Sequence, residues 1–460
     1  MRRRRGRWLL AVCALGLAPG CAGPVERATR EDLEATGRRL APIAGVDDER
    51  ASADAPTVAL DGSLRACLAH AFARSPSLRA RFEAWRAATY GPAMARRLPE
   101  PTISYTWFIG GMDTPMGPQK HRVGVMQMFP WPTRITAASE AEALAAEAAQ
   151  RAFEAEALVV AAEVTRAYWA LWRVRASREV QRAQVDVLKG VGELVRLKMT
   201  TGEGGLGPLA QVDLQIARVE DEVVALDPRE RAAAAELRRA IGAAPGTAVP
   251  TSDEPPPPQR PREGEAELRA AVAGHPEVAE RETMSRAGGE RARAAGAERL
   301  PMFGVGFEWI QIGPARDPTY PRSGMDMFML QAAMQVPLWG RAYAAGVKQA
   351  RAEGAMMAAQ AVATRDRGYA ELEAALAEVD DSARRIKLYA GTLVPQAETA
   401  LGALQGSYQA GRASLADVLM VERDLLELES ARLEARAEHA IAWAELERVV
   451  GRAVAGEDVR

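Results

Sequence analysis

Residues 102–109 read TISYTWFI, and the 67 residues from Thr133 to Met199 that follow are rich in Ala, Glu, Arg and Leu. The short segment alternates polar and apolar side chains, which is typical of a β-strand with one wet face and one apolar face. The long segment has a helical pattern with few interruptions, and a helix of that length rises about 100 Å. A coiled-coil rod explains the long helix but leaves the strand unexplained.

The chain carries this pattern twice, at offsets of 200 to 209 residues. The second copy has strand patterns near 303–309 and 328–336 and a long helical stretch over 341–409. Each copy opens with about 35 helical residues and closes with a return helix, so an opening helix and a return helix placed end to end match one long helix in length. The paired motifs are Arg97-Leu98-Pro99 with Arg299-Leu300-Pro301, Trp131 with Trp339, Leu209-Ala210-Gln211-Val212 with Leu415-Ala416-Asp417-Val418, and Gly242 with Gly451.

We therefore expect a mainly α fold with a small β part, built as two tandem repeats of helix, two strands, very long helix and helix. The strands could also be half-buried members of a soluble sheet. The segments that we expect are a signal peptide (1–20), an N-terminal lipid-anchored segment (21–62), the first repeat (63–245), a proline-rich linker (246–265), the second repeat (266–452) and a C-terminal tail (453–460).

The amino terminus predicts export. Five arginines within residues 2–7 precede an apolar run over 8–18 and the small residues before Cys21, as in a secretory signal peptide. Removal of residues 1–20 changes the formal net charge from −2 to −7. The junction also resembles a bacterial lipobox, in which Cys21 is acylated; the alternative is an ordinary signal peptide with an incidental cysteine. No later stretch has 18 consecutive apolar residues, so we expect no transmembrane helix.

Composition and motifs argue against several functions. Lys plus Arg (59) nearly balances Asp plus Glu (61), which is not the charge pattern of a nucleic-acid-binding protein. The four histidines form no metal-binding pair, and no phosphate-binding loop or nucleophile elbow is present, so we expect no enzymatic activity, no cofactor and no bound metal.

A further set of motifs resembles those of the TolC family of bacterial outer-membrane efflux proteins. These motifs are Tyr389, Leu393–Glu398, Tyr408, Gly411, Ser414–Leu419, and the Ser75-Pro76 and His275-Pro276 pairs. The resemblance implies a homotrimer with a twelve-stranded β-barrel in the outer membrane and a helical tunnel through the periplasm. Four strands per chain agree with this, because the smallest single-chain barrels need eight. Loops 111–120 and 312–324 are then expected outside the cell.

The expected function is an outer-membrane exit duct of a tripartite efflux or type I secretion system. Its partners are a periplasmic adaptor protein, an inner-membrane pump and outer-membrane lipid. The alternative is a periplasmic structural or adaptor lipoprotein without a pore. A narrower hypothesis is export of copper, silver or another heavy metal, because Met325, Met327 and Met329 alternate and thioethers suit Cu(I). Methionine also serves as an adaptable apolar filler.

Two turns and one aspartate are the candidate functional residues. Gly202, Gly205 and Gly207 in the first copy, and Gly411 and Arg412 in the second, lie where the long helix reverses. The resemblance implies that these tips dock the adaptor, although a simple connection also accounts for the glycines.

The position of Asp417 after Gly411 matches a pore-lining aspartate of the family, which implies a ring of three carboxylates at the periplasmic gate. Met420 replaces a second aspartate of the family pattern. The alternative is that Asp417 only favours the start of its helix.

Overall fold

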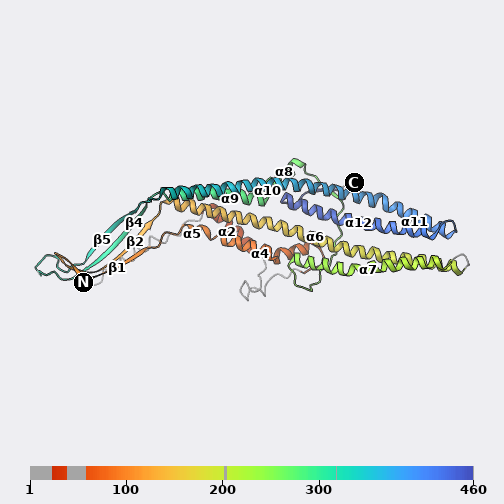
Figure 1. The fold of residues 1–460 in the computed structure, drawn as a ribbon, viewed down its shortest axis with the longest axis horizontal. Coiled ribbons are helices and arrows are strands. Elements are labelled where there is room, and N and C mark those ends of the chain that lie inside the picture. The colour runs from red at the N-terminus through yellow and green to blue at the C-terminus, as the bar shows by residue number, and fades with distance from the viewer. Residues whose placement is uncertain (1–22, 39–58, 201–204, 318, 459–460) are drawn as a thin grey trace. The chain divides into compact units, whose positions relative to one another are not determined.

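The computed structural model describes residues 23–38, 59–200, 205–317 and 319–458. Figure 1 shows that the elements follow the predicted order in both repeats. The first repeat contains α3 (Leu64–Arg74), α4 (Pro76–Ala88), α5 (Gly91–Ala95), β1 (Thr102–Thr114), β2 (Gly117–Phe129), α6 (Pro132–Thr200) and α7 (Leu206–Ile241). The second contains α8 (Glu265–Ala273), α9 (Pro276–Ala297), β4 (Met302–Ile312), β5 (Met327–Gln335), α10 (Gly340–Leu388), a π-helical segment η2 (Tyr389–Leu393), α11 (Val394–Gln409) and α12 (Leu415–Val450). Helix α2 (Pro24–Gly37) precedes the repeats, and two short strands, β3 (Gln259–Pro261) and β6 (Gly456–Asp458), pair with each other.

The long helices begin and end within one residue of the predicted bounds. In the second repeat the helix changes pitch at η2 and continues as α11. The π-helical turn η2 lies just before Pro395, which has no N–H to donate to the carbonyl of Gly391, four residues earlier. A proline in the middle of the sequence pattern therefore modifies the helix without ending it.

The opening helices differ from the prediction of about 35 continuous residues. The first is divided into α3 and α4 at Ser75-Pro76, and the second into α8 and α9 at His275-Pro276. Proline disfavours a helical conformation in the residue before it, but it is well suited to the first turn of a new helix. Each junction receives the end of a return helix: Gly242 lies against the backbone of Arg74, and Gly451 lies against His275. Both glycines have left-handed φ angles, of 68° and 82°.

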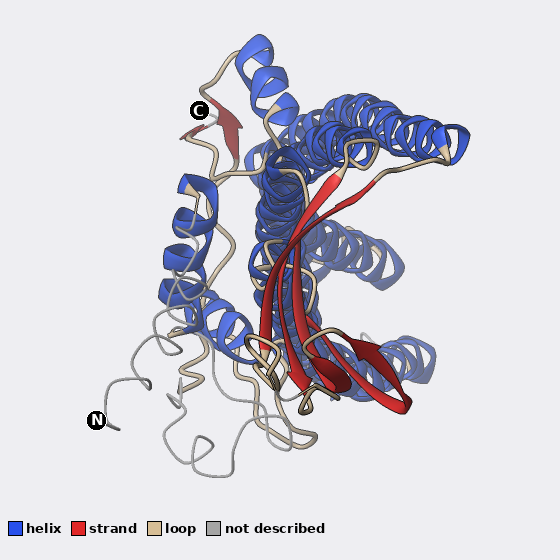
Figure 2. Cartoon of the chain, turned by 90° about the vertical axis from the view of Figure 1, so that its left-hand side faces the viewer, coloured by secondary structure: helices blue, strands red, loops and turns tan. Residues whose placement is uncertain are grey.

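The four long strands form one antiparallel sheet in the order β1-β2-β4-β5, which Figure 2 shows in red. The first hairpin is tighter than predicted: β1 extends to Thr114 and pairs with Gly117, so the expected loop 111–120 is mostly strand. The β4–β5 connection is a true loop over 313–326. The edge strands of the sheet are β1 and β5.

The chain divides into two compact units that cut across the repeats. The first unit contains the four-stranded sheet, within residues 83–150 and 279–361, and the chain up to Glu34. The second contains residues 35–82, 151–278 and 362–460. Among the described residues, no helix has a stretch long and apolar enough to span a lipid bilayer.

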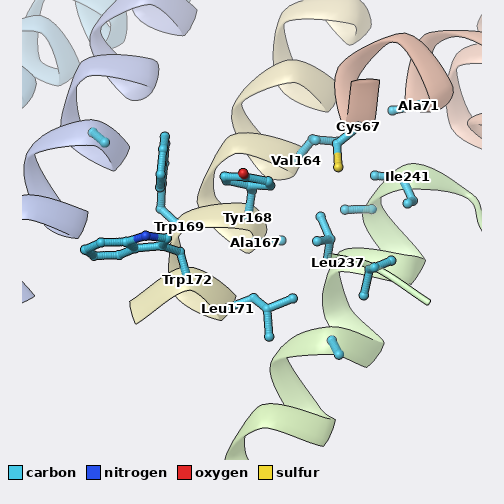
Figure 3. Close-up of a cluster of buried hydrophobic side chains, with 14 of the residues drawn as sticks. Cys67, Ala71, Val164, Ala167, Tyr168, Trp169, Leu171, Trp172, Leu237 and Ile241 are labelled. Atoms are coloured by element: carbon cyan, nitrogen blue, oxygen red, sulfur yellow. The ribbon is translucent and has the colours of Figure 1, made fainter. Parts of the chain in front are cut away.

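The main core of the second unit lies where α3, α6 and α7 meet (Figure 3). Cys67 from α3, Val164 and Tyr168 from α6, and Leu237 and Ile241 from α7 are buried together. The Tyr168 hydroxyl donates to the carbonyl of Gly62 at 2.6 Å and accepts from the amide of Asp253 at 3.0 Å. The core therefore holds the segments before and after the first repeat as well as its helices.

Candidate functional site

The sheet exposes an apolar face to solvent. Strand periodicity places alternate side chains on the same face, and the register aligns those of neighbouring strands, pairing Val125 with Phe307 and Phe307 with Leu330. Ile109 is 86% exposed and Leu330 is 82% exposed. The other exposed members of this face are Ile103, Tyr105, Trp107, Val125, Phe129, Phe303, Val305, Phe307, Phe328 and Met334. A large exposed apolar patch marks a contact with membrane or protein.

The opposite face of the sheet is mixed in character. Arg122 on β2 and Glu308 on β4 form an ion pair at 3.8 Å. The Arg122 guanidinium also lies 5.6 Å from the ring centroid of Phe108. Met327 and Met329 are half-buried on this face, whereas Met325 precedes β5 and is exposed. The alternation that the sequence predicted is therefore present, with one apolar face and one face that carries the polar residues.

Helix α2 is attached to the segment before β1 and to α6 by polar contacts, chief among them an ion pair in which Glu26 is buried. Arg96 donates to both carboxylate oxygens of Glu26, at 2.7 and 3.0 Å, and to the Ser139 hydroxyl at 3.1 Å. The Arg96 guanidinium lowers the pKa of Glu26. Further along, Gln150 donates to Asp32 at 3.1 Å. Because Glu26 meets the early part of α6 and Asp32 a later part, α2 begins at the end of α6 that is nearer the strands. The proposed acylation site, Cys21, lies outside the described residues.

Two helical hairpins are formed by α6 with α7 and by α11 with α12. The tip of the second of these helical hairpins has a turn that requires glycine. Gly411 has a φ of +71°, a conformation that other L-residues adopt only with strain. Its amide donates to the carbonyl of Tyr408 at 3.0 Å, and the amide of Arg412 donates to that of Ser407 at 2.8 Å. These bonds satisfy carbonyls at the end of α11. The Arg412 side chain is exposed at this tip.

The tip of the first hairpin is only partly described. Gly202 lies outside the described residues. Gly205 caps α7 with a φ of −126°, and Gly207 lies in the first turn of that helix. Nothing lies within 4 Å of a Cβ placed at either residue. Neither glycine is therefore required by the local backbone.

Asp417 lies at the third position of α12, in a capping box with Ser414. Its carboxylate accepts from the Ser414 hydroxyl at 2.7 Å and from the Ser414 amide at 3.2 Å, and its amide donates back to the Ser414 hydroxyl at 3.2 Å. The two bonds from Ser414 lower the pKa of the carboxyl. Asp417 thus starts the helix, as the alternative interpretation held, and its place at a pore remains a prediction.

A contact that the sequence did not suggest joins the two hairpins near their tips. The Lys198 ammonium, at the end of α6, donates to the carbonyl of Tyr408 at the end of α11. It also lies 4.3 Å from the ring centroid of Tyr408, within the range of a cation–π interaction. Tyr408 belongs to the family-like motif, but Lys198 is one of many charged residues on a long helix. No local pattern distinguishes it.

A buried acid lies deeper between the same hairpins. Glu422 on α12 is 1% exposed, and its Oε1 accepts from the Gln184 side chain on α6 at 3.1 Å. Its Oε2 is buried with no hydrogen-bond partner among the described residues. Burial raises the pKa of this carboxyl, and the bond from Gln184 opposes the rise. An acidic residue inside an apolar helical stripe was the only signal in the sequence.

The histidines and Cys67 of the second unit lie in local packing and hydrogen-bond contacts. Among the described residues, no group of three or more His, Cys, Asp or Glu side chains is placed to hold a metal ion. His70, His275 and His439 each bond to neighbouring groups in the second unit. Cys67 is buried, and burial with the nearby negative charges of Asp61 and Asp253 raises the pKa of its thiol to about 11.

Comparisons with known proteins agree with this architecture. Residues 268–452 match the family model described as outer membrane efflux protein. A comparison with curated proteins gives no match to the sequence. The fold is similar to that of the outer membrane protein VceC from Vibrio cholerae, with a TM-score of 0.67 and 20% identity over 85% of this chain and 96% of that chain.

Two further solved structures are similar over comparable lengths. For CusC, whose structures concern transmembrane channel formation, the TM-score is 0.69 and the identity 16%, covering 86% of this chain and 94% of that chain. For the open state of the MtrE outer membrane channel from Neisseria gonorrhoeae, the TM-score is 0.64 and the identity 16%, covering 85% of this chain and 89% of that chain. Residues 268–452 therefore match the outer membrane efflux protein family, and the fold of the chain is similar to those of the outer-membrane channels CusC, VceC and MtrE.

Proposed function

We propose that this protein is the outer-membrane exit duct of a tripartite efflux or type I secretion assembly. Three copies form a passive channel, an inner-membrane pump supplies the substrate, and a periplasmic adaptor protein joins the two. Residues 1–20 act as the export signal, 246–265 as the linker between repeats 63–245 and 266–452, and 453–460 as the tail. The match of residues 268–452 to the outer membrane efflux protein family and the fold support this function.

The observation that carries the proposal is the exposed apolar face of the sheet. Its residues, such as Ile109 and Leu330, are exposed far more than a soluble sheet would allow. Its edge strands, β1 and β5, leave backbone donors and acceptors available for pairing. Pairing β5 of one copy with β1 of the next closes a ring of twelve strands from three copies. The apolar face then meets lipid, where closure leaves no unpaired edge.

Helix α2 supports a second, lipid anchor at Cys21. Only four residues lie between Cys21 and Glu26, and the five residue steps that join them reach at most about 18 Å. The ion pair holds Glu26 against Arg96, and Arg96 lies six residues before β1. The short tether from Glu26 therefore keeps Cys21 near the strand ends. In cells grown with a labelled fatty acid, we expect the wild type to incorporate label and Cys21→Ser to lose it. Equal labelling of both proteins contradicts the anchor.

The hairpin tips form the periplasmic mouth in this proposal. Gly202, Gly205 and Gly207 in one tip, and Gly411 and Arg412 in the other, face the adaptor. A cysteine at Arg412 is expected to crosslink to the adaptor in cells, whereas a cysteine at Arg316, in the β4–β5 loop, is not. The reverse pattern contradicts the orientation.

Asp417 contributes one carboxylate per copy to a ring at this mouth. Asp417→Asn keeps a side-chain oxygen that accepts from Ser414, so the helix start is preserved. In planar bilayers we expect the variant trimer to be less cation-selective than the wild type. Unchanged selectivity in an assembled trimer leaves Asp417 with only its capping role.

The central test separates a channel from a pore-less periplasmic lipoprotein. The detergent-extracted protein should migrate as a trimer on a gel when unheated, migrate as a monomer after boiling, and conduct ions in planar bilayers. Adding a charge to the apolar face, as in Leu330→Lys, should abolish assembly into membranes, whereas Gln331→Lys on the opposite face should be tolerated. A monomer without conductance supports the pore-less alternative.

A further inference from the structure

The helix-side rim of the sheet contains two adjoining hollows. The first, of about 520 Å³, is lined by Thr133, Arg293, Gly296, Ala297, Arg299 and Leu300. The second, of about 310 Å³, has a mixed wall, with the apolar side chains of Trp131, Val336, Leu338 and Trp339 beside the polar ones of Arg134, Glu298 and Gln335. Ala297 and Leu300 line both hollows, so the two are neighbours on one surface. All these residues belong to the first compact unit.

The first hollow suits an anion. It presents the guanidinium groups of Arg293 and Arg299 and the hydroxyl of Thr133, and no acidic side chain is among the described residues that line it. Arg293 donates from Nη1 to Glu290 at 2.7 Å, and Arg299 donates from Nε to the carbonyl of Gly296 at 3.4 Å. These bonds orient both side chains at the hollow. The Glu290 carboxylate offsets part of the charge of Arg293, but a guanidinium group has five N–H donors, so both arginines still have donors suited to a phosphate.

The second hollow suits a hydrocarbon chain. Leu338 is 78% exposed and Trp339 is 75% exposed, a state that costs free energy in water. The Trp131 ring packs on Phe303 of the apolar sheet face, with ring centroids 6.1 Å apart, so the hollow is continuous with that face. Arg134 and Glu298 form a 3.6 Å ion pair at its wall and leave little net charge there.

We propose that the two hollows together bind one anionic glycerophospholipid, with its phosphate on Arg293 and Arg299 and an acyl chain along Trp131, Leu338 and Trp339. The proposal rests on the proposed function, which places this rim at the periplasmic headgroup level of the outer membrane. Tryptophan favours that level, and basic residues attract anionic headgroups there. A bound peptide would need acidic and apolar groups at the same spacing, whereas a phospholipid carries both in one molecule.

The test measures phospholipid binding to the detergent-purified, delipidated protein by native mass spectrometry, with phosphatidylglycerol and phosphatidylethanolamine as probes. We expect phosphatidylglycerol to bind more tightly. Arg293→Gln and Arg299→Gln should each weaken it about fivefold, the size expected for one basic residue beside an anionic surface. Trp339→Ser should shorten the residence of long-chain lipid more than that of a dihexanoyl analogue. The matched control is Arg351→Gln, an exposed arginine further along α10 that lines neither hollow.

Several results would overturn the proposal. Equal phosphatidylglycerol binding by Arg299→Gln and the wild type removes the basic hollow as the headgroup site. An equal loss in Arg351→Gln shows nonspecific attraction. Competition by inorganic phosphate as strong as that of the lipid reduces the site to an anion site. Trimer formation and conductance are measured on the same samples, so failure of the channel itself is distinguished from failure of lipid binding.

Discussion

The buried carboxyl of Glu422 offers a sharp test of how the two helical hairpins are held together. In Glu422→Gln the side chain keeps its shape and its oxygen can still accept from Gln184, but the ionisable group is gone. The wild-type Oε2 is buried without a partner among the described residues, so the charged carboxylate is desolvated there, whereas the amide of Gln carries no charge. We therefore expect the variant to be more stable than the wild type at pH 7.5, by about 1.4 kcal/mol for each unit by which burial raises the pKa of Glu422.

The pH dependence follows from the direction of the pKa shift. Burial raises the pKa of Glu422 in the folded state, so the folded protein holds a proton that the unfolded chain releases above about pH 4.3. The free-energy cost of burying the Glu422 carboxylate is absent below that pH, grows as the pH rises, and becomes constant above the folded-state pKa. It reaches about 1.4 kcal/mol for each unit by which the pKa is raised. Glu422→Gln should therefore match the wild type at pH 4 and exceed it at pH 7.5.

Hydrogen exchange of peptides from α12 around residue 422, corrected for intrinsic rates, measures the local opening free energy at each pH. Glu427→Gln is the matched control, because Glu427 lies on the same helix but is exposed, in a 3.6 Å surface pair with Arg423. Its effect should stay below about 1 kcal/mol at every pH. A Glu422→Gln variant that opens more easily at pH 7.5, or that is stabilised equally at pH 4, would refute the reasoning.

Three further predictions concern the tips and the linker. Lys198→Met removes the donor and cation that join the tip of the first helical hairpin to Tyr408 on the second. Because the tips form the mouth of the proposed channel, the reconstituted variant trimer should conduct more than the wild type. Lys189→Met loses only a surface ion pair with Glu220 and should not change the conductance. Gly411→Ala should destabilise the second tip by about 1–2 kcal/mol by hydrogen exchange because its φ is +71°, whereas Gly205→Ala should change little. Burial lowers the pKa of His439, whose Nε2 accepts from the Gln259 amide at 2.9 Å, so pairing of β3 with β6 should weaken as the pH falls below about 6.5. His439→Gln should flatten that dependence in exchange measurements on residues 256–262, and an unchanged profile contradicts it.

The sequence alone determined the order and lengths of the main elements. The helix over 132–200 and the alternating strands near 103 and 303 were predictable because helical and strand periodicities are local properties. The tandem repeat was visible because each copy preserves its motifs in the same order. Gly411 and Asp417 were singled out by spacing, and the structure gives each a local role in a turn or a cap.

Only the tertiary structure decided which of the chain's many charged and polar residues matter to the site. The sequence places Glu422 in an apolar stripe, but only the packing of α6 against α12 shows that it is buried, and Lys198 is ordinary until the end of α11 lies beside it. The prolines that divide the opening helices act locally, but only the fold brings Gly242 and Gly451 against these junctions. Periodicity fixes the face on which a residue lies but not the element that covers that face. Burial, ion pairing and pKa depend on that covering element, so the tertiary contacts determine them.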